Sequence, residues 1–157
     1  MQKVIELLKA KEMTISTMES CTGGGIVNAL TNIPGASDVL KFSAVTYSNE
    51  FKIKMGVDSD VIDKYSVYSM ETAKEMALNI TKFTNSDLGV GITGKLNRAD
   101  SRNTMGKDNQ VFISIYNSND KSYLDKELLI EPDTRENSKE VIIKEVETLL
   151  IDILSRY

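Results

Sequence analysis

The sequence predicts an α/β protein whose mixed β-sheet carries helices on both faces. In the first half of the chain, helical apolar patterns alternate with short runs of strand-forming residues, which is the order that produces parallel strands. In the second half, the strand patterns at 111–116 and 123–130 are separated by a polar turn at 117–120, which is typical of an antiparallel hairpin. We expect residues 1–157 to form one domain with a mostly parallel sheet and this C-terminal hairpin.

The first half begins with a predicted helix near 2–11, where apolar side chains recur at helical spacing. A strand over 13–19 follows. Three glycines then introduce a second helix, which is expected to end near Asn32, before a Pro-Gly pair. The run 42–48 is rich in residues that favour strands and predicts the second strand. Asn49 is expected to cap a short helix that follows it.

Further along, Ser59 and Ser69 are expected to cap helices, and the segment after Ser69 has a clear apolar stripe. Residues 88–93 form a short apolar run and predict a buried strand. The stretch 94–110 is polar and without periodicity, so it predicts a long loop, and loops of this length are often functional. The last helix is expected to begin near Thr134, with an apolar stripe that belongs to the core.

The composition limits the chemistry that is available. A net charge of −4 argues against nucleic-acid binding, and no segment is apolar and long enough to span a membrane, so we expect a cytoplasmic protein without nucleic-acid or membrane partners. The single cysteine, Cys21, agrees with a reducing compartment. The chain has no histidine, which excludes a Ser-His-Asp triad and a His-ligated zinc site within it. We expect no metal and no cofactor.

The most informative stretch joins the first strand to the second helix. Ser20 and Cys21 lie directly before Gly23, Gly24 and Gly25, at a predicted strand-to-helix turn. Glycines allow a sharp turn, and the backbone N–H groups from Thr22 onward can form an oxyanion hole or hold a phosphate. The alternative is an ordinary turn with a capping hydroxyl.

Without histidine, a nucleophilic Ser20 would need lysine, tyrosine or a carboxylate as its base. Lys52 falls in the first turn of a predicted helix, where the helix dipole disfavours its charge, and Tyr47 closes the preceding strand. Lys52 could equally be one of many solvated lysines. Cys21 is an alternative nucleophile or a small buried filler. Glu19 could anchor Lys52, orient Tyr47 or cap neighbouring N–H groups.

Several motifs extend over nearly the whole chain and together resemble the CinA C-terminal domain family, also described as nicotinamide-nucleotide amidases or competence/damage-inducible proteins. The motifs are Glu19-Ser20-Cys21-Thr22-Gly23-Gly24, Pro34-Gly35-Ala36-Ser37, Val45-Thr46-Tyr47-Ser48-Asn49-Glu50-Phe51-Lys52, Gly56-Val57, Ser66-Val67-Tyr68-Ser69, Ala73, Met76-Ala77, Gly91-Ile92-Thr93-Gly94 and, more weakly, Thr134-Arg135-Glu136.

The resemblance implies a three-layer α/β/α sandwich and a bacterial hydrolase of NAD salvage, the pyridine nucleotide cycle. Its implied reaction deamidates nicotinamide mononucleotide to nicotinate mononucleotide and ammonia, without metal. Carried over by position, Ser20 is the nucleophile, Lys52 the base and Tyr47 the relay or orienting group. The residues implied to contact the small-molecule nucleotide substrate are Glu19, Thr22, Gly23, Gly24, Asn49, Thr93 and Gly94.

One departure from the family falls in the loop from Lys95 to Asn109. The family usually continues after Gly94 with a Gly/Pro-rich loop, whereas this chain has a bulky, charged segment. Lys95 and Arg98 could supply phosphate contacts, or the loop could be a solvated surface. The departure keeps two alternatives open: a nucleotide-binding or regulatory module without turnover, and an amidase for another substrate. The sequence also leaves open whether the chain forms a homo-oligomer.

Overall fold

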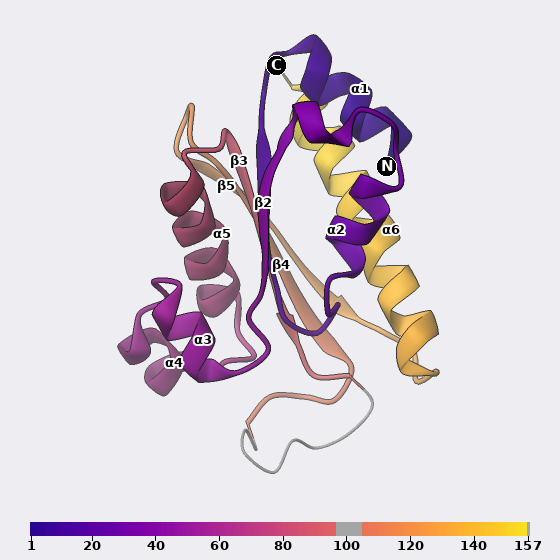
Figure 1. The fold of residues 1–157 in the computed structure, drawn as a ribbon. Helices are drawn as coiled ribbons and strands as arrows, with labels where there is room; N and C mark the ends of the chain where they lie inside the picture. The colour runs from indigo at the N-terminus through magenta and orange to yellow at the C-terminus, as the bar shows by residue number, and fades with distance from the viewer. Residues whose placement is uncertain (97–104, 157) are drawn as a thin grey trace.

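A computed structural model describes residues 1–96 and 105–156 and contains one five-stranded sheet between two layers of helices (Figure 1). The order across the sheet is β2-β1-β3-β4-β5. The strands are β1 (Ile15–Glu19), β2 (Leu40–Val45), β3 (Leu88–Gly94), β4 (Gln110–Asn117) and β5 (Ser122–Leu129). The helices are α1 (Gln2–Ala10), α2 (Gly25–Thr31), α3 (Asn49–Lys54), α4 (Ser59–Tyr65), α5 (Met70–Thr84) and α6 (Arg135–Ser155), with a 3₁₀ turn, η1 (Ala36–Asp38).

The predicted three-layer α/β/α architecture is confirmed. Helices α1, α2 and α6 cover one face of the sheet, and α3, α4 and α5 lie on the other (Figure 1). β1 pairs in parallel with both β2 and β3, whereas β4 is antiparallel to β3 and to β5. Four of the five strands therefore run in one direction. The carboxyl ends of β1, β2 and β3 meet at the lower edge of the sheet in Figure 1, where ligands bind in open α/β sheets.

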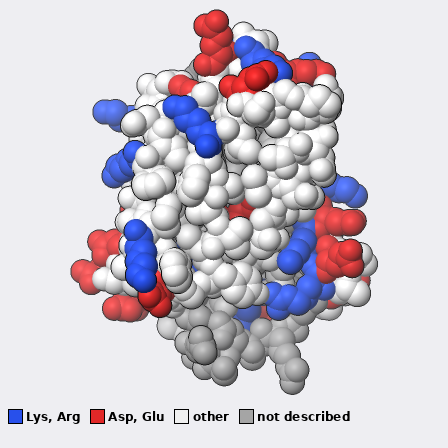
Figure 2. Space-filling model, viewed as in Figure 1, with Lys and Arg blue, Asp and Glu red and all other residues white. Residues whose placement is uncertain are grey.

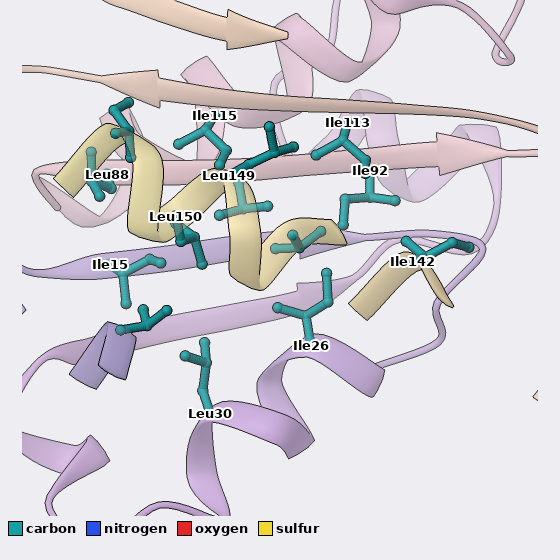
Figure 3. Packing of buried hydrophobic residues seen from close by; sticks show 14 of the residues in the cluster. Ile15, Ile26, Leu30, Leu88, Ile92, Ile113, Ile115, Ile142, Leu149 and Leu150 are labelled. Atoms are coloured by element: carbon teal, nitrogen blue, oxygen red, sulfur yellow. The ribbon is translucent and has the colours of Figure 1, made fainter. Parts of the chain in front are cut away.

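The larger core fills the space between the sheet and α1, α2 and α6. Figure 3 shows Ile92 and Ile113 of the sheet facing side chains such as Ile26 and Leu150 of the helices. On the other face, α5 lies unusually close to β3. A Cβ at Gly91 would lie 2.2 Å from the Ala73 carbonyl oxygen, so glycine is what permits this approach. This close packing fixes the strand end from which the site is built.

Several element ends differ from the sequence-based expectation; β1, for example, begins at Ile15 and not at residue 13. β2 begins at Leu40 and ends at Val45, earlier than the predicted 42–48. Ser48, not Asn49, caps α3 by accepting from the Phe51 N–H, and Asp58, not Ser59, caps α4. In both cases the capping side chain is one residue earlier, because the predicted residue is itself the first helical residue.

Other expectations are confirmed. Ser69 caps α5 through the Thr72 N–H, and Thr134 caps α6 through the Asn137 N–H. Part of the predicted loop, residues 97–104, lies outside the described residues. Within the part of the chain that the structure describes, no helix is long and apolar enough to cross a membrane.

Candidate active site

Ser20 and Lys52 lie together at the carboxyl ends of the parallel strands. Ser20 follows β1 directly, and its N–H continues the strand ladder by donating to the Ile92 carbonyl. The Lys52 Nζ lies 3.0 Å from the Ser20 Oγ and donates to the Thr46 carbonyl at 2.6 Å. The distance to Ser20 suits a hydrogen bond in either direction, so an uncharged amine can accept the serine proton.

The helix that carries Lys52 buries its lysine and exposes its apolar side chains. Lys52 is 1% exposed, whereas Phe51 is 54% and Ile53 is 43% exposed. This inverts the usual pattern for a surface helix, and such inversions are typical of functional positions. Burial lowers the pKa of Lys52 from 10.5 to about 8, because the ammonium form loses hydration. Burial, not the predicted helix dipole, is thus the main cause of the shift.

Glu19 organises the turn that carries Ser20. Its carboxylate is fully buried and accepts from the N–H groups of Ile26 at 3.0 Å and Val27 at 2.8 Å. It also accepts from the Thr22 hydroxyl at 2.7 Å. Of the three roles considered for Glu19, the structure shows the capping role, at the start of α2. The side chains of Glu19 and Thr22 form hydrogen bonds within the turn. Their predicted contact with the substrate stays a prediction.

Of the backbone N–H groups from Thr22 to Gly25, two have no backbone acceptor among the described residues. The Gly23 and Gly25 N–H groups donate to the Ser20 and Thr22 carbonyls. Within the described part of the chain, the N–H groups of Thr22 and Gly24 have no backbone acceptor. Gly24 adopts φ 91°, a left-handed conformation that favours glycine, as the residue before α2. The predicted oxyanion hole therefore narrows to the N–H groups of Thr22 and Gly24 as its candidates.

Cys21 is the less suitable nucleophile. Its side chain is 3% exposed, and burial raises the pKa of its thiol to about 12. The thiol is therefore protonated near neutral pH, and the reactive thiolate is scarce. The alternative of a small buried filler fits this position.

Tyr47 forms a hydrogen bond with Arg135, a residue to which the sequence analysis gave no role. Its side chain is 64% exposed, and its hydroxyl accepts from the Arg135 Nη2 at 3.0 Å. Among the described residues this is its one hydrogen-bond partner, so neither Ser20 nor Lys52 is bound by the hydroxyl. Arg135 also donates to the Leu96 carbonyl at 3.3 Å, which ties the start of α6 to the loop after β3. Only the weak Thr134-Arg135-Glu136 motif signalled this residue.

The other predicted substrate contacts surround the same strand ends. Asn49 begins α3, and Gly94 ends β3. The Thr93 hydroxyl is buried and donates to the Val67 carbonyl at 2.8 Å, so it fixes the segment before α5. Gly23 lies beside α6: the Lys139 Nζ is 3.4 Å from the position that a Cβ on Gly23 would take. Sequence analysis missed Lys139, because only the fold brings α6 to this turn.

The loop after β3 begins with a second buried lysine. Lys95 is 5% exposed, and its Nζ lies 3.3 Å from the Asp108 carboxylate. Lys95 is therefore not a solvated side chain, and its contact with a phosphate stays a prediction. Arg98 lies outside the described residues. No group of three or more His, Cys, Asp or Glu side chains that could hold a metal occurs among the described residues.

Comparisons with known proteins bear on the family and on the fold of this chain. The sequence profile of the CinA C-terminal domain matches residues 1–151. A Clostridium beijerinckii protein whose name refers to competence-damage induction is 51% identical over 92 residues, which are 58% of this chain and 22% of that protein. A "CinA-like protein" of Chloroherpeton thalassium is 49% identical over 90 residues, 57% of this chain and 21% of that protein. The aligned part thus spans about a fifth of these relatives.

The fold is also similar to solved structures. A competence-damaged protein (CinA) superfamily protein of Klebsiella pneumoniae superimposes with a TM-score of 0.91 at 20% identity, covering 99% of this chain and 96% of that chain. The competence/damage inducible protein CihA of Agrobacterium tumefaciens gives a TM-score of 0.84 at 26% identity, covering 98% and 90%. The first likeness supports the fold alone.

Proposed function

This chain belongs to the CinA C-terminal domain family, and from that premise we propose that it is a serine amidohydrolase that deamidates nicotinamide mononucleotide. The observation that carries the proposal is the Lys52 Nζ, which is buried, has no carboxylate partner among the described residues and lies 3.0 Å from the Ser20 Oγ. A lysine held partly uncharged next to a serine hydroxyl is the arrangement that activates serine without histidine. The substrate follows from the family resemblance, and the pair supports the reaction class.

In the proposed first step, the Ser20 Oγ attacks the carboxamide carbon while the Lys52 amine accepts the hydroxyl proton. A C–O bond forms and the carbonyl double bond becomes a C–O⁻ single bond. The N–H groups of Thr22 and Gly24 are the candidates to stabilise this oxyanion. The Thr46 carbonyl accepts a hydrogen bond from Lys52 and would hold the ammonium beside Ser20, from where it can protonate the leaving nitrogen.

In the second step, the C–N bond breaks, the carbonyl re-forms, and Lys52 returns its proton to the nitrogen, which leaves as ammonia. Water then attacks the acyl-Ser20 ester while Lys52 accepts a proton from it. Breaking the ester bond releases the carboxylic acid, which carries the remaining hydrogen of the water, and the proton on Lys52 returns to the Ser20 Oγ. The sum is one carboxamide and one water giving one carboxylic acid and one ammonia.

Basic side chains near the turn support an anionic substrate. Arg135 and Lys139, from the first turns of α6, lie beside Tyr47 and Gly23 respectively. Figure 2 shows Lys and Arg side chains at the lower right, near the start of α6 in Figure 1, with Asp and Glu side chains directly beside them. Because the chain as a whole is negative, Arg135 and Lys139 would favour a phosphate group through direct contacts at the turn, and not through a positive surface.

The test is release of ammonia from nicotinamide mononucleotide by the purified protein. We expect steady release by the wild type and background release by Ser20→Ala. Ser16→Ala is the matched control, because Ser16 is also a buried serine on β1 but hydrogen-bonds Thr84 instead of Lys52. Equal release by wild type and Ser20→Ala, with both variants folded, would reject the serine mechanism.

A second candidate is a nucleotide-binding module without turnover. The observation in its favour is the loop after β3, where Lys95 is held by Asp108 instead of facing a substrate. This candidate predicts that nicotinamide mononucleotide raises the melting temperature but yields no ammonia. Turnover of another pyridine carboxamide, in the same assay, would instead identify an amidase of altered substrate.

A further inference from the structure

We propose that Thr46 is a positioning residue for the Lys52 amine: when Lys52 carries its proton, the Thr46 hydroxyl turns toward the Nζ and accepts a hydrogen bond from it. The contact itself is independent of any reaction, whereas its effect on turnover rests on the amidohydrolase function proposed above. In the steps of that reaction, the Thr46 carbonyl has a part and the Thr46 side chain has none.

The Thr46 hydroxyl is buried without a partner. Thr46 is 3% exposed, and its Oγ1 has no hydrogen-bond partner among the described residues. Such a hydroxyl costs free energy, because it has lost its hydrogen bonds to water and gained none in the protein. Valine has nearly the same shape and would avoid this cost, so the hydroxyl at this position points to a role other than packing.

The hydroxyl lies on the side of the sheet from which Lys52 approaches. Ala44 of β2 packs against a buried cluster with side chains from α4 and α5. Thr46 continues the ladder of β2, since its N–H donates to the Glu19 carbonyl. Because side chains alternate along an extended chain, those of residues 44 and 46 face the same side. Helix α3, which carries Lys52, lies on that side as well (Figure 1).

The protonated Lys52 amine has one N–H more than the acceptors found around it. The Thr46 carbonyl accepts at 2.6 Å, and the Ser20 Oγ lies at 3.0 Å. An ammonium group has three donors, so the third is left without an acceptor among the described residues. The Thr46 hydroxyl belongs to the residue whose carbonyl already binds the Nζ, and a change of its χ1 rotamer turns it toward the amine. The unpaired hydroxyl and the unpaired N–H thus complete each other.

No charged side chain takes this place beside the amine. The titratable groups on the surrounding elements are Glu19 and Cys21 at the end of β1, Tyr47 after β2, Glu50 and Lys54 on α3, Asp58 before α4, Glu71 on α5 and Arg135 on α6. Within the described part of the chain, none of them forms an ion pair with Lys52, and burial raises the pKa of the Cys21 thiol to about 12, which keeps it uncharged. The proton on Lys52 is therefore held by neutral acceptors.

The test is the pKa of Lys52 in the full chain, measured from the NMR chemical shift of its Nζ, with Lys52→Met identifying the signal. In Thr46→Val the ammonium loses an acceptor, so the pKa should fall by about one pH unit, while Thr46→Ser keeps the hydroxyl and should restore the wild-type value. The matched control is Thr81→Val, which should leave the pKa of Lys52 unchanged. Thr81 is also 3% exposed, but its hydroxyl donates to the Ala77 carbonyl on α5.

Turnover gives the second readout. In Thr46→Val the acid limb of the kcat/KM profile for ammonia release should move to lower pH together with the pKa of Lys52. The plateau above it should fall by about tenfold, because the ammonium formed when Ser20 attacks has lost an acceptor. Thr46→Ser should restore both. A wild type that releases no ammonia would refute the amidohydrolase function, and the NMR titration of Lys52 would still decide the role of Thr46.

A third measurement needs no variant of Thr46. The methyl resonance of Thr46 reports its rotamer and should titrate with the same midpoint as the Lys52 Nζ, and it should not titrate in Lys52→Met. The proposal is overturned if this resonance is independent of pH in the wild type. It is also overturned if Thr46→Val raises stability, as loss of an unpaired hydroxyl would, but leaves the pKa of Lys52 unchanged. A shift that Thr46→Ser does not reverse would overturn it too, because the hydroxyl would then not be its cause.

Discussion

Two lysines are almost completely buried in this protein, and they differ in what faces the charge. Lys52 lies against the Ser20 hydroxyl and the Thr46 carbonyl, which are polar but neutral. Lys95, at the loop after β3, lies 3.3 Å from the Asp108 carboxylate. An ammonium group needs a counter-charge when it leaves water, and among the residues that the structure describes Lys95 has one in contact whereas Lys52 has none.

The difference separates a reactive position from a structural one. Burial without a carboxylate lowers the pKa of Lys52 to about 8, so a useful fraction of the amine is uncharged near neutral pH. The Lys95–Asp108 ion pair instead joins the residue after β3 to a residue just before β4. Burial of a lysine is therefore insufficient evidence for a role in catalysis, and the nature of its partner decides the interpretation.

The largest expected effect comes from removing each amine in turn. Lys52→Met should lower kcat for ammonia release from nicotinamide mononucleotide by about 10³-fold, because Ser20 loses its base. Lys95→Met should leave kcat close to that of the wild type and should instead lower the free energy of unfolding. Comparable losses of kcat in the two variants, with folding confirmed by circular dichroism, would erase the proposed distinction.

The second effect is on stability and depends on pH. The folded-state pKa of Lys52 is about 8 and its ordinary value is 10.5, so between these values the unfolded chain holds a proton that the folded chain has released. The free energy of unfolding should therefore rise with pH over this window, by up to about 3 kcal/mol from this group. Below pH 8 both states are protonated and the slope vanishes.

Lys52→Met provides the reference for this measurement, since it has no titrating group at position 52. Urea unfolding of both proteins at pH 7 and pH 10 should show the wild type gaining stability relative to the variant at the higher pH. If the two proteins changed in parallel, Lys52 would have the same pKa in the folded and unfolded chains, contrary to its burial.

The sequence predicted the position of the site better than its internal contacts. The Ser20 turn could be predicted because its glycines and flanking patterns are local. Lys52 was a candidate base from its place in the next predicted helix, and the resemblance supported that role over a solvated lysine. The burial of Lys52 could not be predicted. Hydrophobicity alone would predict that Phe51, and not Lys52, is the buried residue of α3. The Tyr47–Arg135 hydrogen bond joins residues 88 positions apart, and only the packing of α6 beside the turn reveals it.

The third prediction concerns the pH dependence of catalysis. If neutral Lys52 is the base, kcat/KM should fall about tenfold for each pH unit below about 8 and level off above it, because kcat/KM reports the pKa of the free enzyme. Lys95→Met should show the same profile, since Lys95 does not contact the serine. A flat profile between pH 6 and 9 in the wild type would argue against Lys52 as the base.

The smallest effect isolates the ion pair. Asp108→Asn leaves the Lys95 ammonium buried without its carboxylate, but Asp108 is 57% exposed, so water screens much of the loss. We expect destabilisation of about 1 kcal/mol, or a melting temperature lower by about 3 °C, with kcat retained. Asp63→Asn is the control, because Asp63 is an exposed carboxylate on α4 that forms no ion pair among the described residues. An Asp108→Asn variant that keeps its stability but loses turnover would contradict this interpretation. Lys95 would then contribute to catalysis and not only to the stability of the loop.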